Sequence, residues 1–121
     1  MDIFATCVNL AGGKIPSERE MDGLDLSPVL LEGQPSPRNS MFYYRGTHLM
    51  AVRLGAFKAH FFTQPAYGPG AGQRTEHNPP LLYNLERDPG ERYDVAGDHP
   101  DLLEEIAALV AVHRATLQAP P

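Results

Sequence analysis

Apolar residues at helical spacing open the chain and predict a short helix over 2–11. Two adjacent stripes on this helix are formed by Ile3, Cys7 and Leu10 and by Phe4, Val8 and Ala11. A helix of this length is marginal on its own in water, yet its apolar surface is wide. We therefore expect it to be the last helix of a larger body upstream, with Cys7 as a small buried thiol.

The middle of the chain carries segments with the apolar and aromatic character of strands. The expected strands cover 41–45, 48–54, 56–63 and 81–85. The short spacings between the first three predict an antiparallel meander. In the third strand, alternation places Phe57 and Phe61 on one face. The other face holds Lys58, His60 and Phe62.

A stripe of period 3.6 predicts a final helix that starts at Pro100 and covers one face of the sheet. Its members are Leu102, Ile106, Leu109 or Val110, His113 and Leu117. The expected fold class is therefore α+β, a four-stranded antiparallel sheet packed by a C-terminal helix after a short helix and an irregular segment. We expect a linking helix and irregular segment in 1–39 and the sheet with its helix in 40–121.

Two stretches are predicted to lack regular structure. Residues 64–80 are rich in Pro and Gly and predict a loop. Loops of more than about 12–15 residues in compact domains are usually functional or disordered. The sequence Asp88-Pro89-Gly90 predicts a sharp turn after the fourth strand, because Pro presets φ and Gly allows a positive φ.

The overall composition narrows the function classes. The formal net charge is −5, with both signs mixed along the chain, which argues against a nucleic-acid binder. Cys7 is the one cysteine, so neither an internal disulfide nor a zinc site with four thiolates is possible within the chain. The sequence has no apolar run long enough to span a membrane and no signal-peptide pattern at Met1.

Several stretches, in order along almost the whole chain, resemble the sulfatase family. Residues 2–12 (DIFATCVNLAG) resemble a family helix, and residues 21–28 (MDGLDLSP) resemble its "DGxxLxP" stretch. Residues 80–91 (PLLYNLERDPGE) resemble the "LYDLxxDPGE" stretch near the family's C-terminus. Three short stretches resemble the branch of N-acetylgalactosamine-6-sulfatase and arylsulfatase A: 42–46, 51–53 and 58–61.

The resemblance implies a large α/β part that carries the active site and a small C-terminal part with a four-stranded antiparallel sheet under a helix. It also implies a formylglycine made from cysteine in a C-x-P/A-x-R setting, and a calcium ion that neutralises the sulfate. Cys7 is followed by VNLA, which lacks that setting. We therefore expect calcium and formylglycine in a missing N-terminal catalytic domain, and no catalytic or metal-binding residue here. Parent sulfatases are usually periplasmic, extracellular or lysosomal.

Candidate substrate-binding residues lie on the third strand and on the long loop. Lys58 and His60 share a face and could meet an anionic ligand; the alternative is that a neighbouring domain or water covers that face. The resemblance places the loop near the rim of the substrate pocket. There Arg74 and His77 could contact non-reacting groups of a sulfated sugar and Tyr67 could stack on its ring; a mobile polar loop is the alternative.

The remaining polar residues are assigned to structure. Turn chemistry is the expected role of the scattered carboxylates, and capping or packing that of the two histidines near the final helix. These residues are Asp22, Asp25, Glu32, Asp88, Glu91 and Asp94, then His99 and His113.

The leading hypothesis is that the chain is the C-terminal portion of an enzyme that hydrolyses aryl or amino-sugar sulfate esters. We expect the isolated chain to be inactive. The alternative is a stand-alone binding module that self-associates through exposed apolar faces. A third hypothesis, an independent small enzyme, has no support, because the sequence shows no spacing typical of a nucleophile, a base and an orienting group.

Overall fold

The computed structural model describes residues 1–16, 18 and 21–117 of the chain. It divides into two compact units, Met1–Asn39 and Ser40–Pro121. Each unit is described by itself. None of the helices in the described part combines the length and the apolar character needed to cross a membrane.

The first unit contains two helices, α1 (Asp2–Leu10) and α2 (Ser27–Glu32). Its interior is small: among the described residues of the unit, Ala5, Thr6 and Ser27 are buried. The predicted burial of Cys7 is wrong, because its thiol is exposed. The physical reason is that α1 buries its Ala5 and Thr6 side against the unit and leaves its large apolar side chains in water.

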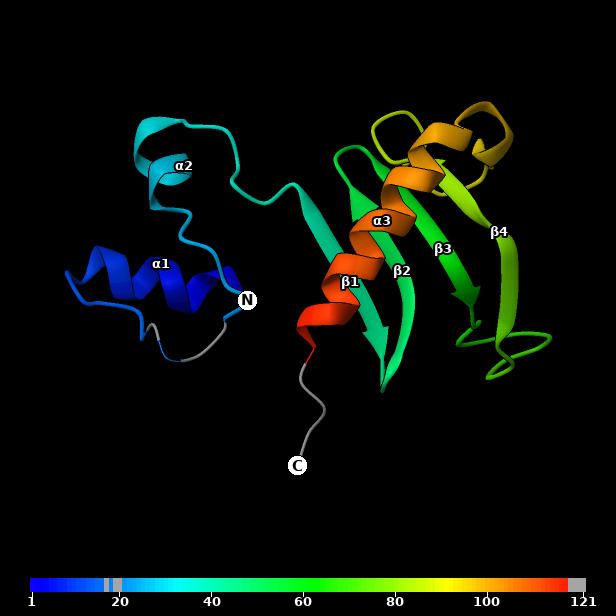
Figure 1. Cartoon of the computed structure of the whole chain (residues 1–121), viewed down its shortest axis with the longest axis horizontal. Coiled ribbons are helices and arrows are strands. Elements are labelled where there is room, and N and C mark those ends of the chain that lie inside the picture. Colours follow the sequence, from blue (N-terminus) through cyan, green and yellow to red (C-terminus); the bar gives the residue numbers. More distant parts are fainter. Residues whose placement is uncertain (17, 19–20, 118–121) are drawn as a thin grey trace. The chain divides into compact units, whose positions relative to one another are not determined.

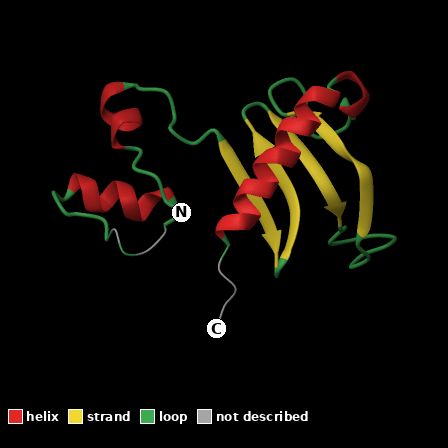
Figure 2. Cartoon of the chain, viewed as in Figure 1, coloured by secondary structure: helices red, strands yellow, loops and turns green. Residues whose placement is uncertain are grey.

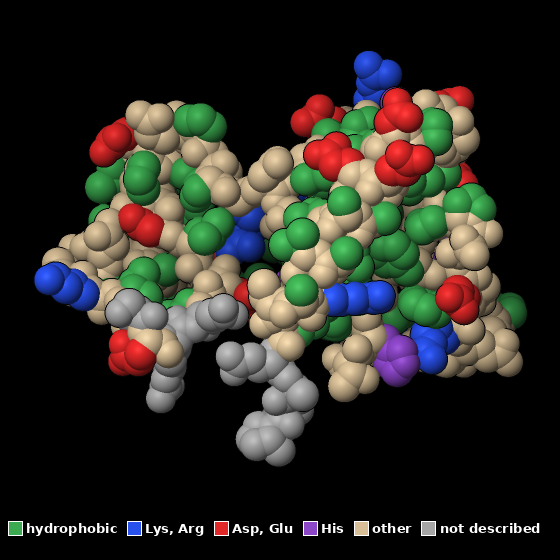
Figure 3. All heavy atoms as spheres, in the orientation of Figure 1, with side chains coloured by type: hydrophobic (Ala, Val, Ile, Leu, Met, Phe, Trp, Pro, Cys, Tyr) green, Lys and Arg blue, Asp and Glu red, His purple; other side chains and the backbone are tan. Residues whose placement is uncertain are grey.

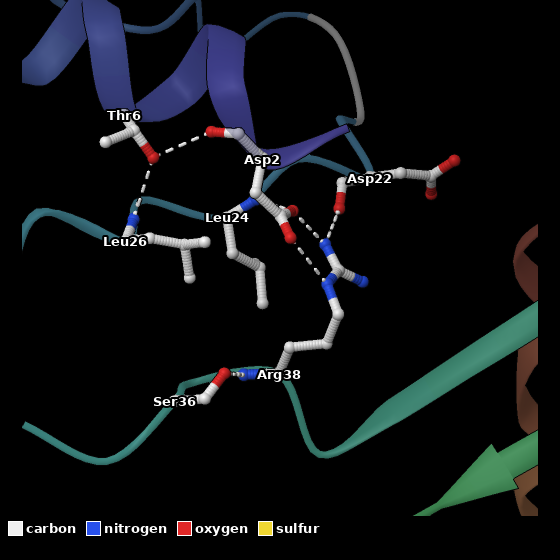
Figure 4. A network of polar contacts seen from close by, with 7 residues as sticks. All are labelled: Asp2, Thr6, Asp22, Leu24, Leu26, Ser36 and Arg38. Carbon is white, nitrogen blue, oxygen red and sulfur yellow. Dashed lines mark hydrogen bonds and ion pairs between the residues drawn. The ribbon is translucent and has the colours of Figure 1, made fainter. Parts of the chain in front are cut away.

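A polar network holds the start of α1 against the segments that precede and follow α2 (Figure 4). The guanidinium of Arg38 donates to the carboxylate of Asp2 through Nε, at 3.0 Å, and also through Nη2. Nη2 donates to the carbonyl of Asp22 at 2.6 Å as well. The Arg38 guanidinium, together with the backbone N–H of Leu24, lowers the pKa of Asp2 to about 2.

The second unit is a four-stranded antiparallel sheet in the order β1-β2-β3-β4, crossed on one face by α3 (Figures 1 and 2). The strands are β1 (Ser40–Arg45), β2 (His48–Leu54), β3 (Phe57–Thr63) and β4 (Thr75–Asn84). A 3₁₀ turn, η1 (Ala96–Asp98), precedes α3 (Pro100–Thr116). The predicted α+β fold class is confirmed.

The core lies between the sheet and α3. Side chains of the three strands β2, β3 and β4 meet two from the helix: Val52, Ala59, Leu82, Ile106 and Val110. Alternation therefore directs Lys58 and His60, the neighbours of Ala59 on β3, to the opposite face, which we call the rear face. Leu117 was predicted in the helix stripe but lies beyond the end of α3 and is exposed.

The predicted loop over 64–80 is too long, because β4 begins at Thr75. Thr75 and Glu76 pair with Thr63 and Phe62 of β3, after a shift of register. Pro79 and Pro80, which the sequence suggests are breakers, lie between the pairs His60↔Leu81 and Phe62↔Glu76, where the register of β3 and β4 shifts. Neither proline has to supply a ladder hydrogen bond there. The loop between β3 and β4 thus covers 64–74.

Candidate functional site

The rear face carries a cluster in which one carboxylate lies between two basic side chains. Oε1 of Glu91 accepts a hydrogen bond from Nζ of Lys58 at 2.7 Å. Oε2 of the same carboxylate lies 2.9 Å from Nε2 of His60. That second contact is close in distance but poorly aligned, and Nε2 is buried without a hydrogen-bond partner in the described residues. The structure thus brings together two of the five predicted site residues.

Aromatic rings from β1 and β4 contact both basic side chains. Nζ of Lys58 lies 4.9 Å from the centre of the Tyr43 ring on β1, a cation–π distance. The His60 ring meets the edge of the Tyr83 ring on β4 at 5.7 Å. As a result, both side chains are largely buried although they carry polar atoms, with 19% of Lys58 and 15% of His60 exposed.

Burial and neighbouring charges set the protonation of the cluster. Burial lowers the pKa of His60, and the positive charge of Lys58 lowers it further, while Glu91 acts in the opposite direction. Burial would raise the pKa of Glu91, but its contacts with Lys58 and His60 outweigh burial and leave it lowered. At neutral pH the cluster therefore holds one full ion pair, Lys58 with Glu91, next to a neutral imidazole.

Glu91 reaches the rear face from the connection between β4 and α3. Oδ2 of Asp88 accepts the N–H groups of Arg92, at 2.6 Å, and Tyr93, at 2.8 Å, which closes the turn around Glu91. Glu91 itself has φ of +52°, a region that non-glycine residues avoid. Sequence reasoning assigned Glu91 to turn chemistry and missed this contact; the signal was two basic residues on one strand face that needed a counter-ion.

The same connection then covers the outer edge of β4. Oδ1 of Asp94 accepts the N–H of Leu82 at 2.9 Å and that of Ala96 at 3.0 Å. The N–H of Val95 donates to the carbonyl of Leu82 at 2.8 Å. These contacts satisfy backbone groups that an edge strand leaves free. In the described part of the chain, no three His, Cys, Asp or Glu side chains converge on a metal position.

The loop 64–74 presents Tyr67 and Arg74 to solvent. Tyr67 is 91% exposed. Two hydrogen bonds of Gly72 close this loop: its carbonyl accepts from Nε2 of Gln64 at 2.6 Å, and its N–H donates to the carbonyl of Pro65 at 2.9 Å. Arg74 lies 5.3 Å from the centre of the Phe62 ring on the rear face.

The predicted loop position of His77 is wrong, since it lies within β4. Its Nε2 is 2.9 Å from Oγ1 of Thr63 on β3. His77 is close enough to lower the pKa of His60 through its charge. It therefore borders the cluster rather than the exposed tip of the loop.

The two histidines associated with α3 pack against aromatic rings. The His113 ring stacks on Phe42 with centroids 3.7 Å apart, and its Nε2 is 3.0 Å from the hydroxyl of Tyr44. His99 meets the ring of Phe57 edge-on at 5.0 Å. Both therefore contribute to the attachment of α3 to the sheet.

Comparison with known proteins gives consistent matches. The model of one family, the C-terminal region of aryl-sulfatase, matches residues 36–121. The chain is 40% identical to N-acetylgalactosamine-6-sulfatase of Canis lupus familiaris, over 97% of this chain and 26% of that protein. It is 42% identical to arylsulfatase A of Homo sapiens, over 90% of this chain and 25% of that protein.

A solved structure shares the fold. The PsFucS1 sulfatase from Pseudoalteromonas sp. superposes with a TM-score of 0.82 at 24% identity, over 95% of this chain and 25% of that one. The chain thus spans about a quarter of the length of the proteins it matches.

Proposed function

The chain belongs to the sulfatase family, as the C-terminal region of its members, and from this we propose that it forms part of an enzyme that hydrolyses sulfate esters. The observation that carries the proposal is the family match over residues 36–121 together with relatives at 40% and 42% identity. Aryl sulfates and sulfate esters of amino sugars are the substrate classes we propose, because the names of these two relatives point to them.

We place the chemistry outside this chain. Three carboxylates of the connection after β4 are already engaged: Asp88 and Asp94 accept backbone N–H groups, and Glu91 contacts Lys58 and His60. These residues do not fit a calcium centre, which needs six to eight oxygen ligands. Cys7 lies in a C-V-N-L-A sequence that does not fit a formylglycine precursor. Both groups are therefore proposed for the N-terminal catalytic domain.

The first unit offers that domain an apolar docking face. Ile3 of α1 is 78% exposed and Phe4 is 52% exposed. Further exposed apolar side chains on the two helices are Leu10, Leu30 and Leu31. Hydrophobic side chains are visible at the surface of the part that carries α1 and α2 (Figure 3). Such a concentration on a small unit marks a surface that another body covers. A second copy of the chain is the competing occupant.

The second unit supplies a wall of the substrate pocket in this proposal. Tyr67 and Arg74 are exposed on the loop 64–74, where a ring and a cation are free to meet a sulfated sugar. His77 lies on β4, where its Nε2 contacts Oγ1 of Thr63. Lys58 and His60 contact Glu91, so they reach a substrate only where that carboxylate gives way.

A chimaera tests the proposal. This chain replaces the matching C-terminal quarter of the canine N-acetylgalactosamine-6-sulfatase, and release of inorganic sulfate is measured from an aryl sulfate and from an amino-sugar sulfate. We expect the chimaera to release sulfate and the isolated chain to release none. A folded chimaera that is inactive on both substrates, or sulfate release by the isolated chain, would contradict the proposal.

Light scattering on the isolated chain addresses the docking face. The variants Ile3→Ser and Leu30→Ser are compared in the isolated chain and in the chimaera. If they abolish both the self-association of the isolated chain and the activity of the chimaera, copies of the chain compete for the surface that the catalytic domain uses. A monodisperse monomer would remove the second copy as an occupant.

A further inference from the structure

We propose that Glu91 is an internal counter-ion that occupies an oxyanion site formed by Lys58 and His60, and that a small oxyanion such as sulfate binds there once the carboxylate is removed. The inference deepens the proposed function, on which its choice of sulfate as the ligand rests. Its geometric basis is that the two oxygens of one carboxylate each lie against a different basic side chain, at 2.7 and 2.9 Å.

The two donors are held in place without Glu91. Lys58 and His60 lie two residues apart on β3, which is paired on both sides. The Tyr43 ring lies beside Nζ of Lys58, and the Tyr83 ring lies against the imidazole of His60. Removal of the carboxylate therefore leaves two basic side chains already directed to the same place, and an entering anion has little ordering cost to meet.

Glu91 is the least firmly placed member of the cluster. It comes from a turn rather than from the sheet, and its φ of +52° costs backbone energy. At 28% it is the most exposed of the three side chains. Its carboxylate leaves Nε2 of His60 without an aligned hydrogen bond in the described residues. A ligand with more oxygens could satisfy both donors, because a tetrahedral oxyanion presents acceptors in several directions.

The ligand class follows from these donors. A lysine ammonium binds an oxyanion as a point charge, and a histidine adds a directed N–H. The neighbours of these donors include two phenol rings, His77, and Arg53, which pairs with Lys58 from β2. Glu91 is the acidic group in contact with both donors among the residues described. While it stays, its charge repels an incoming anion at hydrogen-bond distance, which predicts weak binding in the unmodified chain.

The test is a titration of the full chain with sodium sulfate, followed by NMR signals of the His60 ring and the Lys58 ammonium, at constant ionic strength with chloride as the balancing salt. Glu91→Gly removes the carboxylate and suits the positive φ. We expect it to bind sulfate at least roughly tenfold more tightly than the unmodified chain, because one like charge next to the site is gone. Glu86→Gln, an exposed acid on the same connection, is the matched control and should change nothing.

Two further variants make the test decisive. Glu91→Gln keeps the side-chain size and should also tighten sulfate binding, by less than Glu91→Gly. It provides a second measurement if the glycine variant folds poorly. Lys58→Met added to Glu91→Gly should abolish the gain. Equal sulfate affinity in the unmodified chain and both Glu91 variants, or a gain that survives Lys58→Met, overturns the inference. Because no hydrolysis is measured, that outcome is independent of the chimaera experiment.

Discussion

Arg38 closes the first unit by binding Asp2, the first residue of α1, from a position 36 residues further along the chain. The contact uses two nitrogens of one guanidinium against one carboxylate, a geometry that lysine cannot reproduce. Both side chains are partly buried, with 18% and 19% exposed, and water still reaches the pair. The pair therefore fixes the geometry of the unit more than it adds to its stability.

Loss of Arg38 should release the carboxylate of Asp2. In an Arg38→Met variant, we expect the pKa of Asp2 to rise from about 2 towards its ordinary 3.8, and to stop short of it because the N–H of Leu24 still donates. Arg38→Lys should lie between the two. Since the pKa is lowered in the folded chain, this pair stabilises the unit above the ordinary pKa, and the effect is lost as pH falls through about 2. An NMR titration of Asp2 measures all three values.

Truncation in the core of the second unit should be costly. Ile106 on α3 is 1% exposed and packs in the cluster with Val52 and Leu82. We expect Ile106→Ala to lower the free energy of unfolding by about 2–5 kcal/mol and Ile106→Val by about 0.5–1.5 kcal/mol. Val112, 66% exposed on the same helix, is the control. Its Ala variant should stay within about 0.5 kcal/mol in the same urea titration; an equal loss at both positions would contradict the packing described.

Period and alternation were enough to predict most of the second unit. The range His48–Leu54 of β2 and the start of α3 at Pro100 match the prediction, because both are bounded by turn or cap residues and carry a clear apolar period. The start of β4 was missed because Pro79 and Pro80 masked it. Their tolerance depends on the register shift between β3 and β4, which is a property of the strand pairing and not of the local sequence.

The polar cluster shows the same limit at the level of single side chains. Strand alternation by itself puts Lys58 and His60 on one face. It could not supply Glu91, whose position depends on the path of the connection after β4 and on a positive φ at a non-glycine residue. The prediction for Cys7 failed for a related reason: the helical period identified the apolar stripe, but not which side of α1 the small first unit covers.

The unusual backbone of Glu91 gives a test that separates strain from contacts. Both Glu91→Ala and Glu91→Gly lose the ion pair with Lys58, but only glycine is relaxed at φ of +52°. We expect the glycine variant to be more stable than the alanine variant by about 1 kcal/mol in urea unfolding. At Glu86, where φ is not positive, the order should be reversed or level. Equal stabilities of the two Glu91 variants would show that the turn relaxes.

His60 should make the stability of the second unit depend on pH in a defined direction. Its pKa is lowered by burial and by Lys58, so the unfolded chain binds a proton at a higher pH than the folded one. Stability is therefore fully present above the ordinary pKa of 6.5 and declines as pH falls from there to the folded pKa. A His60→Gln variant should lose this decline.

Lys58→Met provides the matching measurement. Without the Lys58 charge, the pKa of His60 should rise, because Glu91 is then left to favour the protonated ring. NMR titration of the imidazole measures the pKa of His60 in Lys58→Met. Urea unfolding at a series of pH values measures the pH dependence of stability in His60→Gln. A His60 pKa that stays constant in Lys58→Met would show that the charge of Lys58 has no part in setting it.

The exposed loop predicts a kinetic effect without a structural one. In the chimaera, Tyr67→Ala should raise KM for an amino-sugar sulfate by about two- to tenfold and leave kcat nearly unchanged. The variant removes a stacking contact of about 0.5–1.5 kcal/mol that stabilises the bound substrate and the transition state equally. Tyr93→Ala is the matched control, because Tyr93 is also exposed, at 71%, but belongs to the connection after β4. Urea unfolding should be the same in both variants, as neither ring is packed. If KM rises equally in both, the loop 64–74 has no special place at the substrate, and Arg74 loses its proposed role with it.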